Sequence, residues 1–230
     1  MAAEEDRRTS RIRDQGTENG LFRACMDQIK TAHSTGQALR TAMVAAGLMT
    51  DKHCYAELLG QFYVCTAALE QRLSRARTDS TLVARVSALG YAFTGGYERD
   101  LAALLGESEW RSIVSSRTSE PAKHYVQYIE TASESDLVGA AFILWGPLVI
   151  GGGAALKPRV SKTFGMDATN VFASVVGPSR GKRRAEFIAV FDSLFTSKDD
   201  PRFADVVSAA GKCMALNVRA SAMLPVLNQP

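Results

Sequence analysis

Apolar residues recur along this chain at steps of three and four, the spacing that places side chains on one face of an α-helix. Near the N-terminus this stripe runs through Phe22, Met26 and Ile29 and then reaches a polar residue, His33. Asp51 suits the N-cap of a second long helix, whose apolar stripe follows directly. The first part of the chain therefore predicts two long amphipathic helices, with His33 on the inner face of the first.

Further helices are predicted from similar stripes and from the turn residues between them. No run alternates apolar and polar residues with the period of two that marks a β-strand. We therefore predict an all-α, single-domain multi-helix bundle over residues 20–228, preceded by a disordered polar tail over residues 1–19. The further helices are expected at residues 82–91, at 97–105 after Gly95-Gly96, from Pro121, at 137–156, at 182–195 and from Pro201.

One predicted helix, Leu137–Leu156, contains no charged residue and is long enough to cross a bilayer. Its glycines and Pro147, and the lack of a second such segment, favour a helix buried inside the protein instead. The run Gly151-Gly152-Gly153 is unfavourable in a helix, by about 1 kcal/mol for each glycine relative to alanine, and invites a kink. Such a cost usually has a packing reason, so we expect the backbone to approach either another helix or a flat ligand here.

The formal net charge is only +3 over 230 residues, whereas nucleic-acid-binding domains usually have a strong basic excess. We therefore predict no nucleic-acid partner. The basic residues are unevenly spread, and Arg180 with residues 182–184 forms either a solvated helix start or an anion site. The first twenty residues lack the apolar core of a secretory signal, and the four cysteines lack metal-ligand spacing. We expect free thiols in a cytoplasmic protein.

Two polar residues interrupt predicted core faces, and a third lies beside one. A histidine on an apolar face is more often bonded to a carbonyl than to a metal, but a desolvated, neutral imidazole at His33 would suit iron. Asn217, on the stripe of the last helix, must satisfy its amide inside the protein. Tyr63 would need a partner for its hydroxyl if that group is buried. No phosphate-binding loop, nucleophile elbow or zinc-protease motif is present.

At these positions the chain resembles the heme oxygenase family. The first matching block is Lys30-Thr31-Ala32-His33, which is similar to the family's proximal-helix segment ending in the axial histidine. The order and spacing of the blocks agree from about residue 20 to residue 225. The other blocks are Phe62-Tyr63 through Ala68-Leu69-Glu70, Tyr97 to Ala102 with Gly106 and Trp110, Pro121 through His124-Tyr125-Val126, and Ala215-Leu216-Asn217.

This resemblance implies a heme sandwiched between a proximal helix and a kinked distal helix. His33 would be the ligand to the heme iron, and Lys30 and Arg184 would face the heme propionates. The family's next basic position, one turn after Arg184, is Ile188 in this chain, so the propionate clamp is thinner. The resemblance also suggests Gln37, Met214 and Val149 against the heme, Gly152 and Gly153 over its distal face, and Tyr63 and Asn217 in the catalytic network.

The distal helix departs from the family pattern, which has an aspartate before its glycine pair. That acid holds a water that directs oxygen onto the porphyrin ring. Its equivalent in this chain is Val149, or Pro147 in a shifted register. Trp145 also stands where the family often has arginine. The resemblance therefore supports the fold and heme binding more directly than ring oxygenation.

Three functions stay open. The favoured one is oxidative cleavage of heme to biliverdin, iron and CO, with O₂ and electrons from a reductase. The second is heme binding for storage, trafficking or sensing without turnover, and the third is a heme-free enzyme for small molecules on the related helical scaffold. We expect a cytoplasmic monomer without a membrane span.

Overall fold

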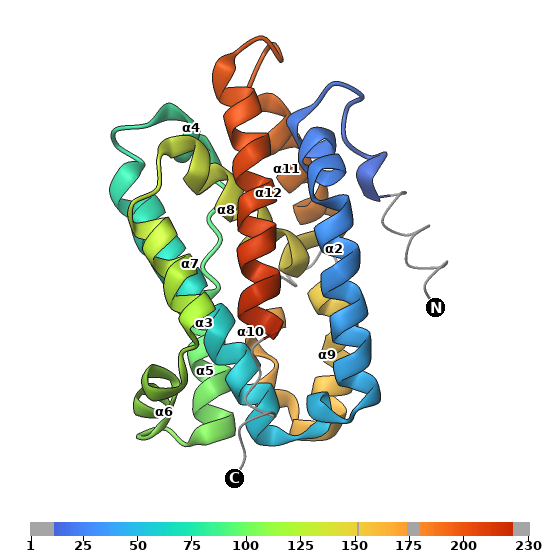
Figure 1. Ribbon diagram of the computed structural model, residues 1–230, viewed down its shortest axis with the longest axis vertical. Helices are drawn as coiled ribbons and strands as arrows, with labels where there is room; N and C mark the ends of the chain where they lie inside the picture. The colour runs from blue at the N-terminus through green and yellow to red at the C-terminus, as the bar shows by residue number, and fades with distance from the viewer. Residues whose placement is uncertain (1–11, 151, 174–179, 223–230) are drawn as a thin grey trace.

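The computed structural model describes residues 12–150, 152–173 and 180–222. This part of the chain contains helices, turns and loops but no strand, which confirms the predicted all-α fold. The ends of the chain at residues 1–11 and 223–230 lie outside the described residues. The helices in Figure 1 are α2 (Leu21–Ala45), α3 (Lys52–Ala76), α4 (Thr81–Ser87), α5 (Thr94–Leu105), α6 (Trp110–Arg117), α7 (Glu120–Glu130), α8 (Glu134–Ile150), α9 (Gly152–Phe164), α10 (Asn170–Ala173), α11 (Arg180–Ser193) and α12 (Pro201–Ala222), with 3₁₀ turns η1 (Leu48–Thr50) and η2 (Met166–Ala168).

Helix starts that depend on nearby residues agree with the predictions. The Asp51 carboxylate accepts a hydrogen bond from the amide of Cys54 at 2.8 Å and caps α3, as expected. Pro121 lies in the first turn of α7, where its missing N–H costs nothing. Helix α8 begins slightly before the predicted start, because Ser133 and Asp136 cap each other's backbone amides, each at 3.2 Å.

The predicted start of α5 at Tyr97 was wrong. The helix begins at Thr94 and includes Gly95 and Gly96 in its first turn. The carboxylate of Glu70 on α3 accepts hydrogen bonds from the amides of Phe93 at 2.6 Å and Thr94 at 3.3 Å. These bonds stabilise a helix start that the glycine pair alone would not favour.

The uncharged segment at residues 137–156 forms two helices instead of one kinked helix. Helix α8 ends at Ile150 and α9 begins at Gly152, with Gly151 outside the described residues. Residues 137–146 are all buried, which confirms the prediction of an internal helix. Within the described ranges, no helix has the length and apolar character needed to cross a membrane.

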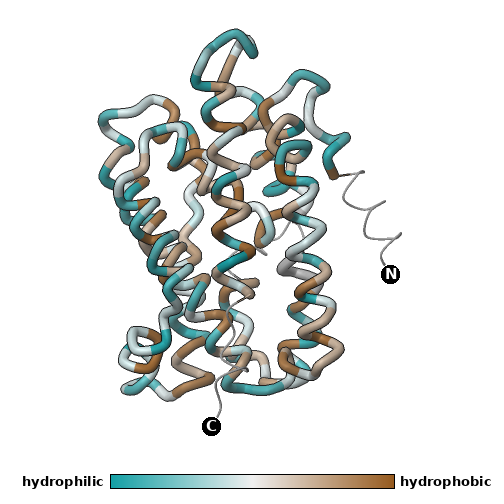
Figure 2. The backbone as a smooth tube through the Cα atoms, viewed as in Figure 1, coloured by the Kyte–Doolittle hydropathy of each residue, from teal (hydrophilic) through white to brown (hydrophobic). Residues whose placement is uncertain are grey.

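Helix α12 packs against both α8 and α2 and runs through the middle of the view in Figure 1. Its buried residues include Phe203, Val206 and Met214, and hydrophobic and hydrophilic segments alternate along it in Figure 2. Gly139 permits the close crossing with α8, because a Cβ there would lie 2.7 Å from the Cβ of Ala209. The bundle thus brings the first long helix and the last helix together.

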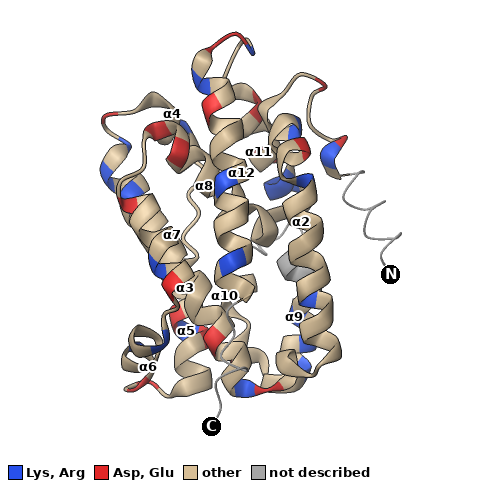
Figure 3. Ribbon diagram, in the orientation of Figure 1, with Lys and Arg blue, Asp and Glu red and all other residues tan. Residues whose placement is uncertain are grey.

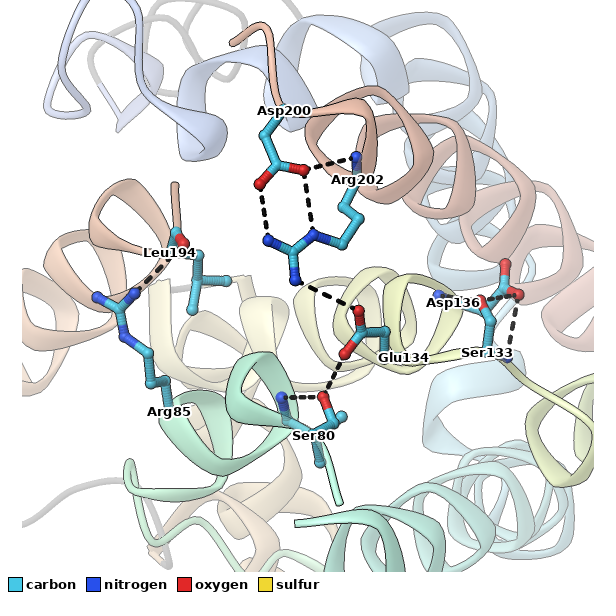
Figure 4. Close-up of polar contacts among 9 residues, drawn as sticks. Ser80, Arg85, Ser133, Glu134, Asp136, Leu194, Asp200 and Arg202 are labelled. Carbon is cyan, nitrogen blue, oxygen red and sulfur yellow. Dashed lines mark hydrogen bonds and ion pairs between the residues drawn. The ribbon is translucent and has the colours of Figure 1, made fainter. Parts of the chain in front are cut away.

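A polar network joins the N-terminal ends of α4, α8 and α12 (Figure 4). The Glu134 carboxylate accepts a hydrogen bond from Ser80 Oγ at 2.5 Å and lies 3.6 Å from an Arg202 nitrogen. Arg202 also pairs with Asp200, at 2.7 Å. The arginine is partly exposed, so the pairs fix geometry more than they add stability.

Residues 12–19, which were predicted to belong to the disordered tail, are described by the structure and reach α11. The amide of Thr17 donates a hydrogen bond to the carboxylate of Asp192 at 2.8 Å. Of the predicted tail, only residues 1–11 lie outside the described residues.

Candidate functional site

His33 lies on α2, one turn after the last fully apolar position of its stripe. Phe22 and Ile29 are buried on this stripe, and His33 is half-buried. The next turn carries Gly36, where a Cβ would lie 3.1 Å from Val218 Cγ2 and 3.8 Å from Met214 Cε. The histidine is therefore adjacent to the point at which α12 approaches α2 closely.

Helix α12 supplies two predicted site residues to this approach. Met214 is buried and faces Gly36, and half-buried Gln37 follows on α2. Asn217, one turn after Met214, is 9% exposed, and its carbonyl accepts a hydrogen bond from Ser221 Oγ at 2.9 Å. The structure thus brings α2 around His33 to α12 around Met214.

The predicted cationic residues come from two helices. Lys30 is exposed one turn before His33, and Arg184 is half-buried on α11, which packs against α2. Ile188, one turn after Arg184, is 6% exposed and provides no charge. Figure 3 shows further basic positions on α9 and α12, which include the exposed residues Arg159, Lys162, Lys212 and Arg219.

The C-terminal half of α8 is tightly packed. Val149, the residue predicted to align with the family's aspartate, is completely buried, whereas Pro147, the residue predicted in the shifted register, is exposed. Gly152 and Gly153 form the first turn of α9, and the surroundings of residues 152–155 lie outside what the structure describes.

Glu70 was not predicted as a site residue, although it reaches α8. Burial raises the pKa of Glu70, and hydrogen bonds from Thr94 and Phe93 and the nearby indole N–H of Trp145 oppose this shift. Trp145 is 2% exposed, and its ring lies edge-on to Tyr91 at 5.4 Å. The one sequence signal for Glu70 was the Leu69-Glu70 pair, which does not reveal that the carboxylate approaches α8.

Tyr63 lies on α3, two turns before Glu70. Its hydroxyl donates a hydrogen bond to Glu98 on α5 at 3.2 Å, and its ring lies edge-on to Trp110 on α6 at 5.3 Å. Burial raises the pKa of the Tyr63 phenol, and the charge of Glu98 adds to that shift. These contacts connect α3 with α5 and α6.

The cysteines are free thiols, as predicted. Cys25, Cys65 and Cys213 are buried and Cys54 is half-buried. Among the residues that the structure describes, no group of three or more His, Cys, Asp or Glu side chains could hold a metal ion. A metal ion bound at His33 would therefore need most of its ligands from a cofactor and not from protein side chains.

The comparisons with known proteins agree with this architecture. The family model described as heme oxygenase matches residues 21–222. No curated protein sequence matches the chain.

Solved structures share the fold at low sequence identity. Heme oxygenase 2 from Chlamydomonas reinhardtii, solved without heme, is 21% identical with a TM-score of 0.80, and the match covers 91% of this chain and 100% of that one. Heme oxygenase-1 from the cyanobacterium Synechocystis, in complex with heme, is 22% identical with a TM-score of 0.69, covering 88% and 90%. Heme oxygenase from Leptospira interrogans is 17% identical with a TM-score of 0.74, covering 89% and 100%.

Proposed function

Because the chain belongs to the heme oxygenase family, we propose that it binds heme against α2, with the His33 imidazole as the ligand to the iron. The observation that carries the proposal is the place of His33, half-buried beside the close approach of α12 at Gly36. A neutral imidazole can donate a nitrogen lone pair to a metal.

The donor set suits a porphyrin better than a bare metal ion. Within the described ranges no cluster of metal-binding side chains is present, so His33 would act as a single protein ligand. A porphyrin supplies its own four nitrogen ligands and needs only one axial group from the protein. Bound heme would supply the redox-active iron and would itself be the substrate.

We propose that Lys30 and Arg184 bind the heme propionates. Lys30 is exposed one turn before His33, and Arg184 is half-buried on the helix next to α2. An arginine can bind a carboxylate through two parallel hydrogen bonds, whereas the lysine acts as a point charge. Met214, Asn217 and Gln37 would line the same side of the heme.

The proposed activity is oxidative cleavage of heme to biliverdin, iron and CO, with O₂ and electrons from a reductase. Family membership supports it, as does the place of the predicted distal glycines, Gly152 and Gly153, in the first turn of α9. Since Val149 is apolar and completely buried, it cannot hold a proton-donating water. Backbone groups near Gly152 and Gly153 would have to hold that water.

The buried Val149 also favours a second candidate function, heme binding without turnover for storage, trafficking or sensing. A protein that only holds heme needs the axial histidine and the propionate partners. It does not need an acid on the distal side. The two functions therefore use the same binding residues and differ in whether biliverdin, iron and CO are formed.

The test begins with a hemin titration followed at the Soret band. Wild type and His124→Ala, which changes an exposed histidine on α7, should bind hemin, and His33→Ala should lose the axial ligation. A wild-type chain without a Soret shift, or an unchanged spectrum in His33→Ala, would refute the heme site and favour a heme-free enzyme. Addition of ascorbate or a reductase then decides between cleavage, seen as a biliverdin band, and binding alone, seen as a stable or merely bleached heme.

A further inference from the structure

The N-terminus of α2 is capped by a residue from α11. The Oδ1 atom of Asp192 accepts a hydrogen bond from the amide of Phe22 at 2.9 Å, and Oδ2 accepts one from Thr17 at 2.8 Å. Helix α2 has no capping side chain of its own, because its N-cap is Gly20 and its first turn contains no acidic residue. The helix that carries His33 therefore depends on Asp192 for the amide of Phe22, which a local cap would otherwise satisfy.

The surrounding loop is shaped to admit this carboxylate. A Cβ on Gly20 would lie 2.1 Å from Asp192 Oδ1, and a Cβ on Gly16 would lie 3.4 Å from Oδ2 and 2.8 Å from the ring of Phe22. Any side chain at Gly20 would displace the carboxylate. The glycines and Asp192 thus form one closely fitted contact, which we call the α2–α11 clasp.

The same turn of α2 is also fixed by apolar contacts. The ring of Phe22 lies 5.6 Å from that of Phe142 on α8 and 6.4 Å from that of Phe187 on α11. Phe22 is completely buried. Polar and aromatic contacts together fix the start of α2 against both α8 and α11.

A small rotation at the clasp would displace the proposed heme partners, because both lie far from it along their helices. His33 is eleven residues beyond Phe22, or roughly 16 Å along α2, and Arg184 is eight residues before Asp192, or roughly 12 Å along α11. A tilt of about 5° at the clasp shifts each residue by roughly 1 Å, enough to spoil a metal–ligand bond or a bidentate contact.

We propose that Asp192 is a positioning residue, which holds α11 on α2 so that Arg184 and His33 reach the same heme. This inference rests on the function proposed above. It assigns no contact between Asp192 and heme. Replacement of Asp192 should therefore lower the hemin affinity in a way that depends on Arg184, and it should not remove the axial ligand itself.

The first experiment compares two aspartates that cap long helices. Asp192→Ala should weaken hemin binding by roughly tenfold, whereas Asp51→Ala, which removes the cap of α3, should leave the affinity within about twofold. Asp192→Asn keeps an oxygen acceptor for one of the two amides and should recover part of the affinity. Equal hemin affinities in Asp192→Ala and wild type, or an equal loss in Asp51→Ala, would overturn the inference.

A double-mutant cycle with Arg184→Ala separates positioning from general stability. If Asp192 acts by aligning Arg184 with His33, Asp192→Ala should cost much less affinity once Arg184 is gone. Additive losses would overturn the inference. A wild-type chain that does not bind hemin would refute the proposed function and this inference with it, whereas wild-type binding with unaffected Asp192 variants would refute the inference alone.

Discussion

Replacement of Gly139 by alanine tests the crossing of α8 and α12. An added Cβ would lie 2.7 Å from the Cβ of Ala209, 2.8 Å from the amide nitrogen of Ala210 and 2.9 Å from the carbonyl carbon of Ala209. Two of these atoms belong to the backbone of a helix and cannot turn aside as a flexible side chain could. Either the two helices must separate or α12 must shift along its axis.

Two effects of opposite sign decide the magnitude. Alanine is favoured over glycine inside a helix by about 1 kcal/mol. Overpacking typically costs about 1–3 kcal/mol, and contacts with backbone atoms place Gly139→Ala at the upper end. The variant should therefore lose about 2 kcal/mol of unfolding free energy.

Gly146 on the same helix provides the matched control. A Cβ there would meet only Ile150 Cδ1, at 3.8 Å, which is an ordinary contact distance. Gly146→Ala should therefore gain up to about 1 kcal/mol from helix propensity. The two variants should differ by about 3 kcal/mol, or roughly 6–12 °C in Tm for a chain of this size.

Thermal unfolding followed by circular dichroism at 222 nm measures this difference, with urea unfolding as a second assay. A Gly139→Ala protein at least as stable as wild type would refute the close crossing. An equal loss in both variants would attribute the effect to the helix backbone of α8 instead of its contact with α12.

Two further predictions concern ionisable groups. Burial raises the pKa of Glu57, and the Arg117 guanidinium at 3.7 Å opposes this only in part. The folded protein then binds the proton of Glu57 more tightly than the unfolded chain does. Wild type should therefore lose stability relative to Glu57→Gln as the pH rises from about 4.3, the pKa in the unfolded chain, through the pKa in the folded protein. Urea midpoints that change in parallel with pH in the two proteins would contradict this. Burial also raises the pKa of Cys65 and Cys213 to about 12. Half-buried Cys54 should therefore react first with a thiol reagent at pH 8, and Cys54→Ser should remove the fast phase of this reaction. A fast phase that persists in Cys54→Ser would contradict the assignment.

Features set by nearby residues were predictable from sequence. The cap at Asp51 and the place of Pro121 in the first turn of α7 depend on residues within a few positions, and both agree with the structure. The burial of residues 137–146 followed from the absence of charge over that segment. His33 attracted notice because a polar residue interrupted an apolar stripe, and its half-buried place on α2 agrees with that pattern, whereas its role as a heme ligand stays a prediction.

Features set by distant residues were not predictable in the same way. Gly95 and Gly96 are normally turn residues, and they join α5 because Glu70, on another helix, satisfies the amides at its start. Asp192 caps α2 through the amide of Phe22, which lies 170 positions earlier in the sequence. A single sequence contains no local signal for either pairing.

The neighbouring positions of α2 and α12 have a consequence for synthesis. Gly36 and Met214 meet across these helices, although 178 residues separate them in the chain. At about 5–20 residues per second, the ribosome would expose α2 for roughly 10–40 s before its partner emerges. During that interval the part of α2 around Gly36 lacks the helix that covers it in the folded protein. The last helix therefore determines when the proposed site can first form, and a chain cut short before α12 would leave that part of α2 open to aggregation.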